Sequence, residues 1–176
     1  GGTNPMPGEV SLAHNGVLYC DEFPEYSRTV LEVLRQPLED RKIIVARAKN
    51  TVEYPSSVML VASMNPCPCG YFTHPTRECT CTAVQVQKYL GRVSGPLLDR
   101  IDLHIDILPL SFEEMSKTSV SESSSEIRER VIKARKIQEE RYREHPLIHC
   151  NAQMTPALLR QHAVLEEKAL KILKNA

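Results

Sequence analysis

The sequence predicts an α/β fold in which a largely parallel sheet is followed by C-terminal helices. Three apolar runs of strand length, each bounded by polar or turn residues, support this prediction: residues 17–20, 58–62 and 101–108. Continuous apolar runs such as the first two are typical of strands that are buried on both faces. Helical signals between the runs favour parallel strands that are joined by helices.

The segment between the first two runs is expected to hold a helix and a hairpin. Ser27 is placed to cap the helix, apolar side chains follow it at helical spacing, and Pro37 is expected to end it. Residues 42–46 and 52–54 flank a polar turn, which predicts two paired strands. The strand over residues 58–62 then delivers Asn65 at its carboxyl end.

The later part of the chain is expected to be mainly helical. Residues 84–90 look helical, and a Ser-rich stretch precedes a helix that reaches about residue 143. Ser123 and Glu126 have the spacing of a capping box for that helix. Thr155 followed by Pro156 predicts the start of a last helical region. These helices are expected to lie outside the sheet.

Composition fits a globular chain and excludes several other classes. Of 176 residues, 41% are apolar and 25% are charged, which excludes a disordered acidic tail or a collagen. Twenty-two basic and 22 acidic residues give zero formal charge, which argues against a dedicated phosphate-backbone binder. No apolar run is long enough for a membrane span, and no signal peptide is visible. A cytoplasmic protein without a membrane partner is therefore expected.

Polar side chains follow the first two predicted strands. Asp21 and Glu22 come directly after the first, where one carboxylate can hold Mg²⁺ and the next can orient or deprotonate an attacking water. Asn65 follows the second, where an amide can position a water or contact a terminal phosphate. Each motif alone also fits a simpler structure, namely a solvated acidic turn or an ordinary Asn-Pro turn.

Arg100 lies beside acidic residues shortly before the third run. The functional interpretation is an arginine finger, because the guanidinium fork can neutralise charge on a phosphoryl group in transfer. The alternative is a local surface ion pair.

Four cysteines stand in two C-x-C pairs within one Pro-rich and Gly-containing loop: Cys67, Cys69, Cys79 and Cys81. Four thiolates suffice for a tetrahedral Zn²⁺ site, and they leave no open position for a substrate, so the predicted role is structural. A loop with so little apolar surface also gains much from a metal. His74 lies between the pairs and offers a substitute ligand; the alternative is four reduced thiols or two disulfides.

Taken together and in this order, the motifs resemble the AAA+ ATPases, and more narrowly their Mg-chelatase-like, competence-associated branch. The matching stretches cover most of the first 110 residues: 7–14, 16–24, 30–39, 63–70 and 94–102. The resemblance implies a partial AAA+ P-loop-type core over residues 1–110. It also implies a Ser-rich linker over residues 111–125 and a truncated helical lid over residues 126–176.

The resemblance assigns roles to the polar residues. Asp21 and Glu22 are implied to be the Walker B pair, Asn65 is implied to be sensor 1, and Arg100 the finger that acts in trans. ATP and Mg²⁺ are the implied cofactors. The implied assembly is a ring, expected as a hexamer, in which each site lies between subunits.

The chain also departs from the family pattern. It contains no G-x-x-x-x-G-K-[ST] phosphate loop, and it stops before the sensor 2 arginine of the family. The parent protein is therefore expected to hydrolyse ATP, whereas this stretch alone is expected to be inactive. The family resemblance also implies that the hairpin over residues 42–54 faces a central pore. Its basic side chains then either touch a threaded polymer or are simply solvated: Arg41, Lys42, Arg47 and Lys49.

Three functions remain in view. The first is a ring-forming motor that couples ATP hydrolysis to DNA remodelling in competence or recombination, with helicase-like action. The second is the ATPase subunit of magnesium chelatase, although the Cys-rich loop favours the competence-like branch. The third is a zinc-stapled nucleic-acid-binding module, against which the zero net charge and the 5% aromatic content argue.

Overall fold

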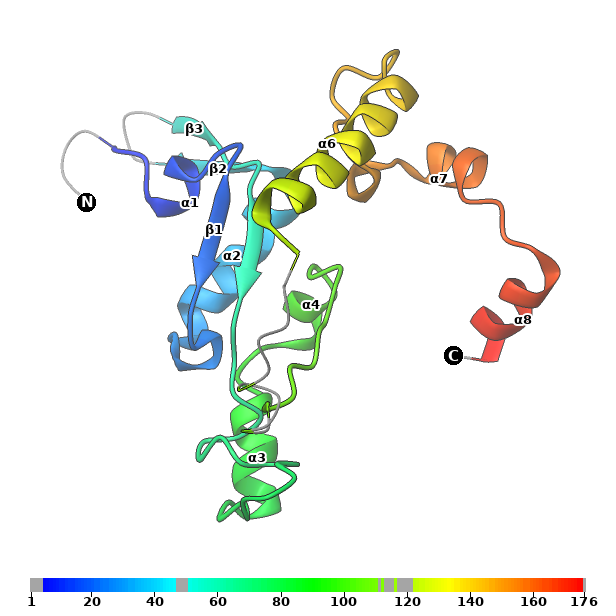
Figure 1. Cartoon of the computed structure of the whole chain (residues 1–176). Helices are drawn as coiled ribbons and strands as arrows, with labels where there is room; N and C mark the ends of the chain where they lie inside the picture. Colours follow the sequence, from blue (N-terminus) through cyan, green and yellow to red (C-terminus); the bar gives the residue numbers. More distant parts are fainter. Residues whose placement is uncertain (1–4, 47–50, 111, 113–115, 117–121, 176) are drawn as a thin grey trace. The chain divides into compact units, whose positions relative to one another are not determined.

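The computed structural model describes residues 5–46, 51–110, 112, 116 and 122–175 (Figure 1). The chain divides into two compact units, Gly1–Leu110 and Ser111–Ala176. The first has mixed α/β structure and the second is helical. Within the described ranges, no helix combines the length and the apolar composition that crossing a membrane requires.

A parallel pair of strands lies at the centre of the first unit. Strand β1 (Val17–Cys20) pairs in register with β4 (Met59–Ala62), so that Cys20 stands opposite Ala62. This confirms the first two predicted strands and their parallel direction. The connection between them contains the helix and the hairpin that the sequence predicts.

The predicted third strand, over residues 101–108, is wrong for this structure. The segment is neither strand nor helix, and the exposed fractions of Leu103, Ile105 and Ile107 are 78%, 78% and 90%. A strand forms only where a neighbour exchanges backbone hydrogen bonds with it. Within the described part of the chain, no segment pairs with this one.

The two-stranded sheet is buried on one face only, which corrects the expectation of two buried faces. Leu18 and Leu60 pack against the core, whereas Val17 and Tyr19 are 58% and 59% exposed. The core consists of side chains from β1, the following turn, two helices beside the sheet, and the connection that leads into the second of these helices: Cys20, Phe23, Leu31, Leu34, Val93 and Leu97. Side chains along a strand alternate between the two faces of the sheet. The described helices cover one face, so only every second side chain of β1 and β4 points toward them.

Helix α2 (Arg28–Asp40) follows β1 through a short 3-10 turn, η1 (Phe23–Glu25). Ser27 caps it as predicted, with its Oγ accepting from the Val30 backbone N–H at 3.4 Å. The helix does not end at Pro37, and this prediction is wrong. It ends at Asp40, and the next residue, Arg41, adopts a left-handed conformation at φ 54° and donates its N–H to the Pro37 carbonyl at 2.9 Å. The final turn is therefore closed despite the proline.

The predicted hairpin is confirmed. Strands β2 (Lys42–Ala46) and β3 (Thr51–Pro55) are antiparallel, and Lys42 forms an ion pair with Glu53 at 3.1 Å. A four-residue helix, α1 (Glu9–Leu12), precedes β1. The hairpin turn, with Arg47 and Lys49, lies outside the described residues.

Two helices follow the Cys-rich loop. Helix α3 (Ala83–Leu90) begins with a capping box in which Thr82 and Gln85 satisfy each other's backbone N–H groups. The short α4 (Gly95–Leu98) places Leu97 in the core with no exposed surface. Arg100 follows α4 directly.

The second unit contains the helices α6, α7 and α8, and the described residues Phe112 and Ser116 before them are also helical. Helix α6 (Ser124–Arg141) begins with the predicted capping box and ends slightly before the predicted residue. The last helical region is divided into α7 (Pro156–His162), which Thr155 caps, and α8 (Glu167–Asn175). A short 3-10 turn, η2 (Asn151–Gln153), lies between α6 and α7. Of the predicted linker over residues 111–125, residues 111, 113–115 and 117–121 lie outside the described residues, and residues 124 and 125 already belong to α6.

Candidate functional site

The carboxyl ends of β1 and β4 meet at one edge of the sheet. Two backbone hydrogen bonds join the chain segments beyond this edge. The Ser63 N–H donates to the Cys20 carbonyl at 3.0 Å, and the Phe23 N–H donates to the Ser63 carbonyl at 2.8 Å. Because both strands are parallel, the residues that follow them are held side by side. Asp21 and Glu22 lie at this edge with Ser63.

Asp21 is held as an ionised carboxylate. Its Oδ1 accepts hydrogen bonds from the Ser63 hydroxyl, from the Glu22 N–H at 3.1 Å and from the Tyr19 hydroxyl at 3.3 Å. The Ser63 hydrogen bond is the largest of the effects that lower the pKa of Asp21. Asp21 therefore presents a full negative charge at neutral pH, and its second oxygen makes no hydrogen bond within the described residues.

Sequence reasoning missed Ser63. No sequence signal singles it out, because only the register of the structure, which sets Cys20 opposite Ala62, brings the next residues Asp21 and Ser63 together. A hydroxyl directly after the second strand is therefore in position to contact the carboxylate after the first. Ser63 Oγ also accepts from the Glu22 N–H at 3.3 Å, so one side chain contacts both acidic residues.

Glu22 has an unusual backbone conformation. Its φ and ψ are 48° and 47°, in the left-handed region that residues other than glycine seldom adopt. The buried Phe23 and Pro24 follow it and fix the chain direction there. The Glu22 side chain is exposed and forms neither an ion pair nor a hydrogen bond with the described residues. Backbone strain of this kind is frequent at functional sites.

Asn65 lies three residues beyond the end of β4, and its side chain is exposed. Its amide makes no hydrogen bond within the described residues. The chain therefore carries Asn65 past the edge that holds Asp21 and Glu22, and within the described residues no hydrogen bond joins its side chain to them. Its participation in the same site stays a prediction.

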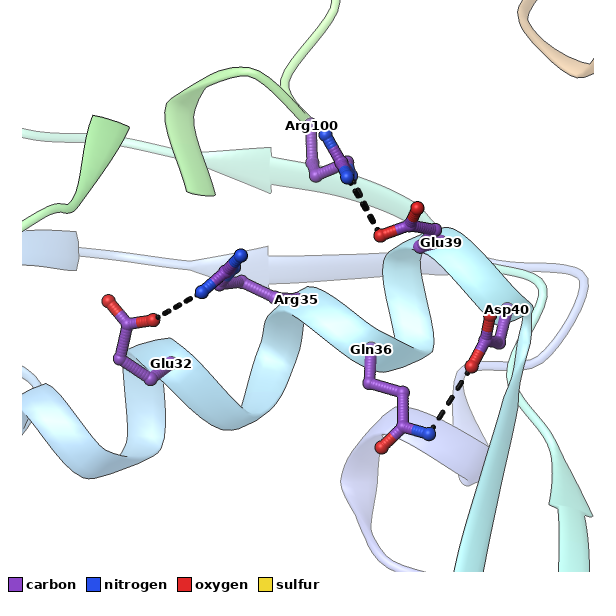
Figure 2. A network of polar contacts seen from close by, with 6 residues as sticks. All are labelled: Glu32, Arg35, Gln36, Glu39, Asp40 and Arg100. Carbon is purple, nitrogen blue, oxygen red and sulfur yellow. Dashed lines mark hydrogen bonds and ion pairs between the residues drawn. The ribbon is translucent and has the colours of Figure 1, made fainter. Parts of the chain in front are cut away.

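Arg100 forms an ion pair rather than lying free. Its Nη2 and Nε both donate to Glu39 Oε2, at 2.8 Å and 3.2 Å (Figure 2). The Glu39 carboxylate raises the pKa of Arg100. Glu39 belongs to the last turn of α2, whereas Asp21 and Glu22 precede the first turn of that helix. Arg100 is therefore not brought into contact with the acidic pair of its own chain.

The four predicted cysteines converge, in a loop between β4 and α3. Their sulfur atoms all lie within 4.8 Å of one another. Cys67 Sγ is 3.3 Å from Cys69 Sγ and 3.7 Å from Cys79 Sγ. Cys69 Sγ and Cys79 Sγ are 3.5 Å apart. A tetrahedral ion with Zn–S bonds of about 2.3 Å requires sulfur atoms about 3.8 Å apart. The donor set and its spacing therefore fit a Cys₄ zinc site.

The thiols of this cluster cannot all ionise without a cation. The Tyr71 backbone N–H lowers the pKa of Cys69 to about 5. The Cys81 backbone N–H favours the Cys79 thiolate, but burial and the neighbouring Cys69 and Cys67 outweigh it and raise the pKa of Cys79 to about 12. Adjacent thiolates repel each other, and a bound divalent ion would remove this repulsion.

His74 is not part of the cluster, so its proposed substitution for a sulfur ligand is wrong within the described residues. Its Nδ1 instead accepts the backbone N–H groups of Thr76 and Arg77, at 3.2 Å and 3.1 Å. Gly70, at φ 81°, makes the turn between the first two cysteines and the rest of the loop. The imidazole thus shapes the loop and does not face the sulfur atoms.

Comparison with protein-family models gives two matches. The model for magnesium chelatase, subunit ChlI, matches residues 1–115, and the model for the ChlI C-terminal region matches residues 121–176. The two matches together include every residue that has been given a site role above.

Curated relatives are also found. The competence protein ComM of Haemophilus influenzae is 47% identical over 142 residues, which is 80% of this chain and 28% of the relative. The uncharacterized protein YifB of Escherichia coli is 41% identical over 169 residues, 96% of this chain and 32% of the relative. The uncharacterized protein Rv2897c of Mycobacterium tuberculosis is 41% identical over 170 residues. The chain spans about a third of the length of these relatives.

Proposed function

This chain belongs to the Mg-chelatase-like family, and we propose that it carries part of the ATPase site of a ring-forming AAA+ motor. The observation that carries the proposal is the shared edge of β1 and β4. There Asp21 and Glu22 are held by Ser63, and the carboxylate of Glu22 is left unpaired within the described residues. Residues 1–110 are assigned to the AAA+ core, and residues 126–176 to the helical lid.

Asp21 is the proposed holder of Mg²⁺. Carboxylate, hydroxyl and amide oxygens are the ligands that Mg²⁺ prefers, and Asp21, Ser63 and Asn65 offer such atoms near this edge. The lowered pKa keeps Asp21 charged at every pH at which ATP itself is fully ionised. When bound, the ion neutralises phosphate charge and orients the terminal phosphoryl group.

Glu22 is the proposed group that orients and deprotonates the attacking water. Its side chain has no hydrogen-bond or ion-pair partner among the described residues. Its backbone is left-handed, so the chain changes direction at Glu22 after β1. Asn65 is proposed to contact the terminal phosphate or the same water. Arg100 is proposed to act on the nucleotide of a neighbouring subunit, since its own α2 separates it from Asp21 and Glu22.

A structural zinc in the cysteine cluster is part of the proposal. Its four sulfur atoms converge in a loop that has little apolar core of its own, and a metal would fix the loop that leads from β4 to α3. Four thiolates complete the coordination shell, so no substrate chemistry is assigned to this metal.

Remodelling of DNA is the proposed work of the motor. It is supported by the competence protein ComM among the relatives and by the resemblance of the motifs to the competence-associated branch. Within the described part of the hairpin, Arg41 is half-buried and Lys42 pairs with Glu53. Contact of the hairpin with a threaded polymer, through Arg41, Lys42, Arg47 and Lys49, stays part of the proposal.

The ATPase subunit of magnesium chelatase is a second candidate, because the matching family model carries that description. The two candidates share the hydrolytic site and differ in what hydrolysis drives. Purified full-length protein distinguishes them: stimulation of ATP hydrolysis by DNA favours the motor, and stimulation by a porphyrin-binding partner favours the chelatase subunit.

The ATPase proposal is tested by Glu22→Gln in the full-length protein. We expect ATP binding to persist and turnover to fall by about 100-fold or more, because a general base contributes this much to catalysis. Glu25→Gln is the matched control, since Glu25 lies on the same turn but pairs with Arg92 at 2.6 Å. Hydrolysis by Glu22→Gln at the wild-type rate would refute the role of Glu22.

A further inference from the structure

The segment that carries Arg100 is fixed to helix α2. Leu97 of α4 is fully buried in the same apolar cluster as Leu31 and Leu34 of α2. Beyond this apolar contact, Glu39 of α2 reaches Arg100 at the end of the segment. The position of Arg100 is therefore determined by a helix that begins shortly after the acidic pair at the sheet edge.

The Glu39–Arg100 pair uses one edge of the guanidinium. The Nε and Nη2 groups both donate to a single oxygen, Glu39 Oε2 (Figure 2). Nη1 donates to no acceptor within the described residues, and Nη2 has a second N–H. Because the guanidinium is a planar fork with five N–H donors, the edge opposite Glu39 remains able to bind phosphate oxygens.

We propose that Glu39 is a positioning residue that orients Arg100 toward the terminal phosphate of ATP on a neighbouring subunit. This inference rests on the proposed ATPase function and assigns a further residue to it. The pair orients the guanidinium through one edge and leaves the other for the phosphate. The Arg100 side chain is 36% exposed, so it is accessible from outside its own chain.

The alternative role, a purely structural ion pair, is disfavoured by its surroundings. The Glu39 side chain is 59% exposed, and exposed ion pairs of this kind contribute little to folding stability. The same helix turn carries Asp40, whose carboxylate only accepts from Gln36 at 3.2 Å. What distinguishes Glu39 from Asp40 is thus its contact with Arg100.

The test measures steady-state ATP hydrolysis by the full-length protein and its Glu39→Gln variant. We expect kcat to fall by about tenfold, with KM for ATP changed by about twofold at most, because misorientation of a group that acts in the transition state lowers kcat. Glu39→Asp, which keeps the charge, should recover part of the loss. Asp40→Asn is the matched control and should hydrolyse ATP like the wild type.

Two further measurements separate positioning from general damage. In an Arg100→Ala background, Glu39→Gln should have no additional effect on kcat, because its partner is already absent. In the otherwise wild-type protein, Glu39→Gln should make Arg100 react faster with phenylglyoxal, as followed by mass spectrometry. Arg35, which pairs with Glu32 on the same helix at 3.1 Å, should react at an unchanged rate.

The outcomes are distinguishable from those of the proposed function. If the wild-type protein does not hydrolyse ATP, or if Arg100→Ala keeps wild-type activity, the proposed function of Arg100 fails and this inference fails with it. If Arg100→Ala is inactive while Glu39→Gln keeps the wild-type kcat, only the positioning role is overturned. An equal loss from Glu39→Gln with and without Arg100 would also overturn it.

Discussion

At the scale of single residues, the hydrogen bond from Ser63 is the main contact that keeps the Asp21 carboxyl group ionised. The Ser63 hydroxyl and the backbone around it join the ends of two strands that lie far apart in sequence. Asp21 and Glu22 are visible in the sequence because two adjacent carboxylates follow an apolar run. Ser63 is not, because a serine after a strand is common and only the register between β1 and β4 gives it a partner.

Ser63→Ala should raise the pKa of Asp21. The Ser63 hydrogen bond is the largest of the effects that lower this pKa, so its loss shifts the pKa toward the ordinary value of 3.8. A carboxyl group with a lowered pKa favours the folded state above its unfolded pKa, and this contribution is lost as pH falls through the folded pKa. The variant should therefore show a weaker acid dependence of stability.

NMR titration of the Asp21 carboxyl carbon measures this shift directly. Ser57→Ala is the matched control, because Ser57 lies near the other end of β4. An unchanged Asp21 pKa in Ser63→Ala would show that the hydroxyl does not stabilise the carboxylate.

At the scale of elements, local signals predicted the helix starts well. The three predicted caps, Ser27, Ser123 and Thr155, each accept a backbone N–H at the start of a helix; Thr82 does the same for α3 but was not predicted. Pro37 shows the limit of such signals, because closure of the last turn by Arg41 lets α2 continue beyond it. The prediction of a third strand over residues 101–108 was wrong for a different reason. Strand pairing depends on a distant segment, which hydrophobicity alone does not identify.

Thr82→Ala should destabilise the first unit by about 1 kcal/mol, because it removes the capping box at the start of α3. Chemical denaturation, followed by circular dichroism, measures the change in the free energy of unfolding. Thr80→Ala is the control, since Thr80 is exposed and its side chain makes no hydrogen bond within the described residues. Equal stability of Thr82→Ala and Thr80→Ala would contradict the role of the cap.

The Cys-rich loop should contain about one zinc ion per chain in protein purified without chelator. Cys79→Ser should lower the zinc content and the melting temperature, whereas Cys150→Ser should change neither, because Cys150 lies in the second unit outside the cluster. Zinc should be released as pH falls, because protons compete for the thiolates. Metal analysis by mass spectrometry measures the zinc content at each pH, and thermal denaturation measures the melting temperature. Full retention of zinc by Cys79→Ser would contradict the proposed zinc site.

At the scale of the whole molecule, the sequence predicted the family from motifs that span most of the first unit, and the family match confirms it. The arrangement of the catalytic parts could not be predicted in the same way. Asp21 and Glu22 lie before α2, while Arg100 is paired with Glu39 near the end of that helix. Sequence order alone does not show that α2 separates the two groups.

The central claim is that one chain supplies Glu22 and its neighbour supplies Arg100, and mixing two impaired full-length variants tests it most directly. Glu22→Gln and Arg100→Ala are each expected to keep only a small residual rate alone. In a randomly mixed ring, about a quarter of the interfaces join an intact Glu22 to an intact Arg100, because each interface pairs two different surfaces. The account predicts that equimolar mixing restores about a quarter of the wild-type ATPase rate. A mixture no more active than its two components, although mass spectrometry shows mixed rings, would contradict it.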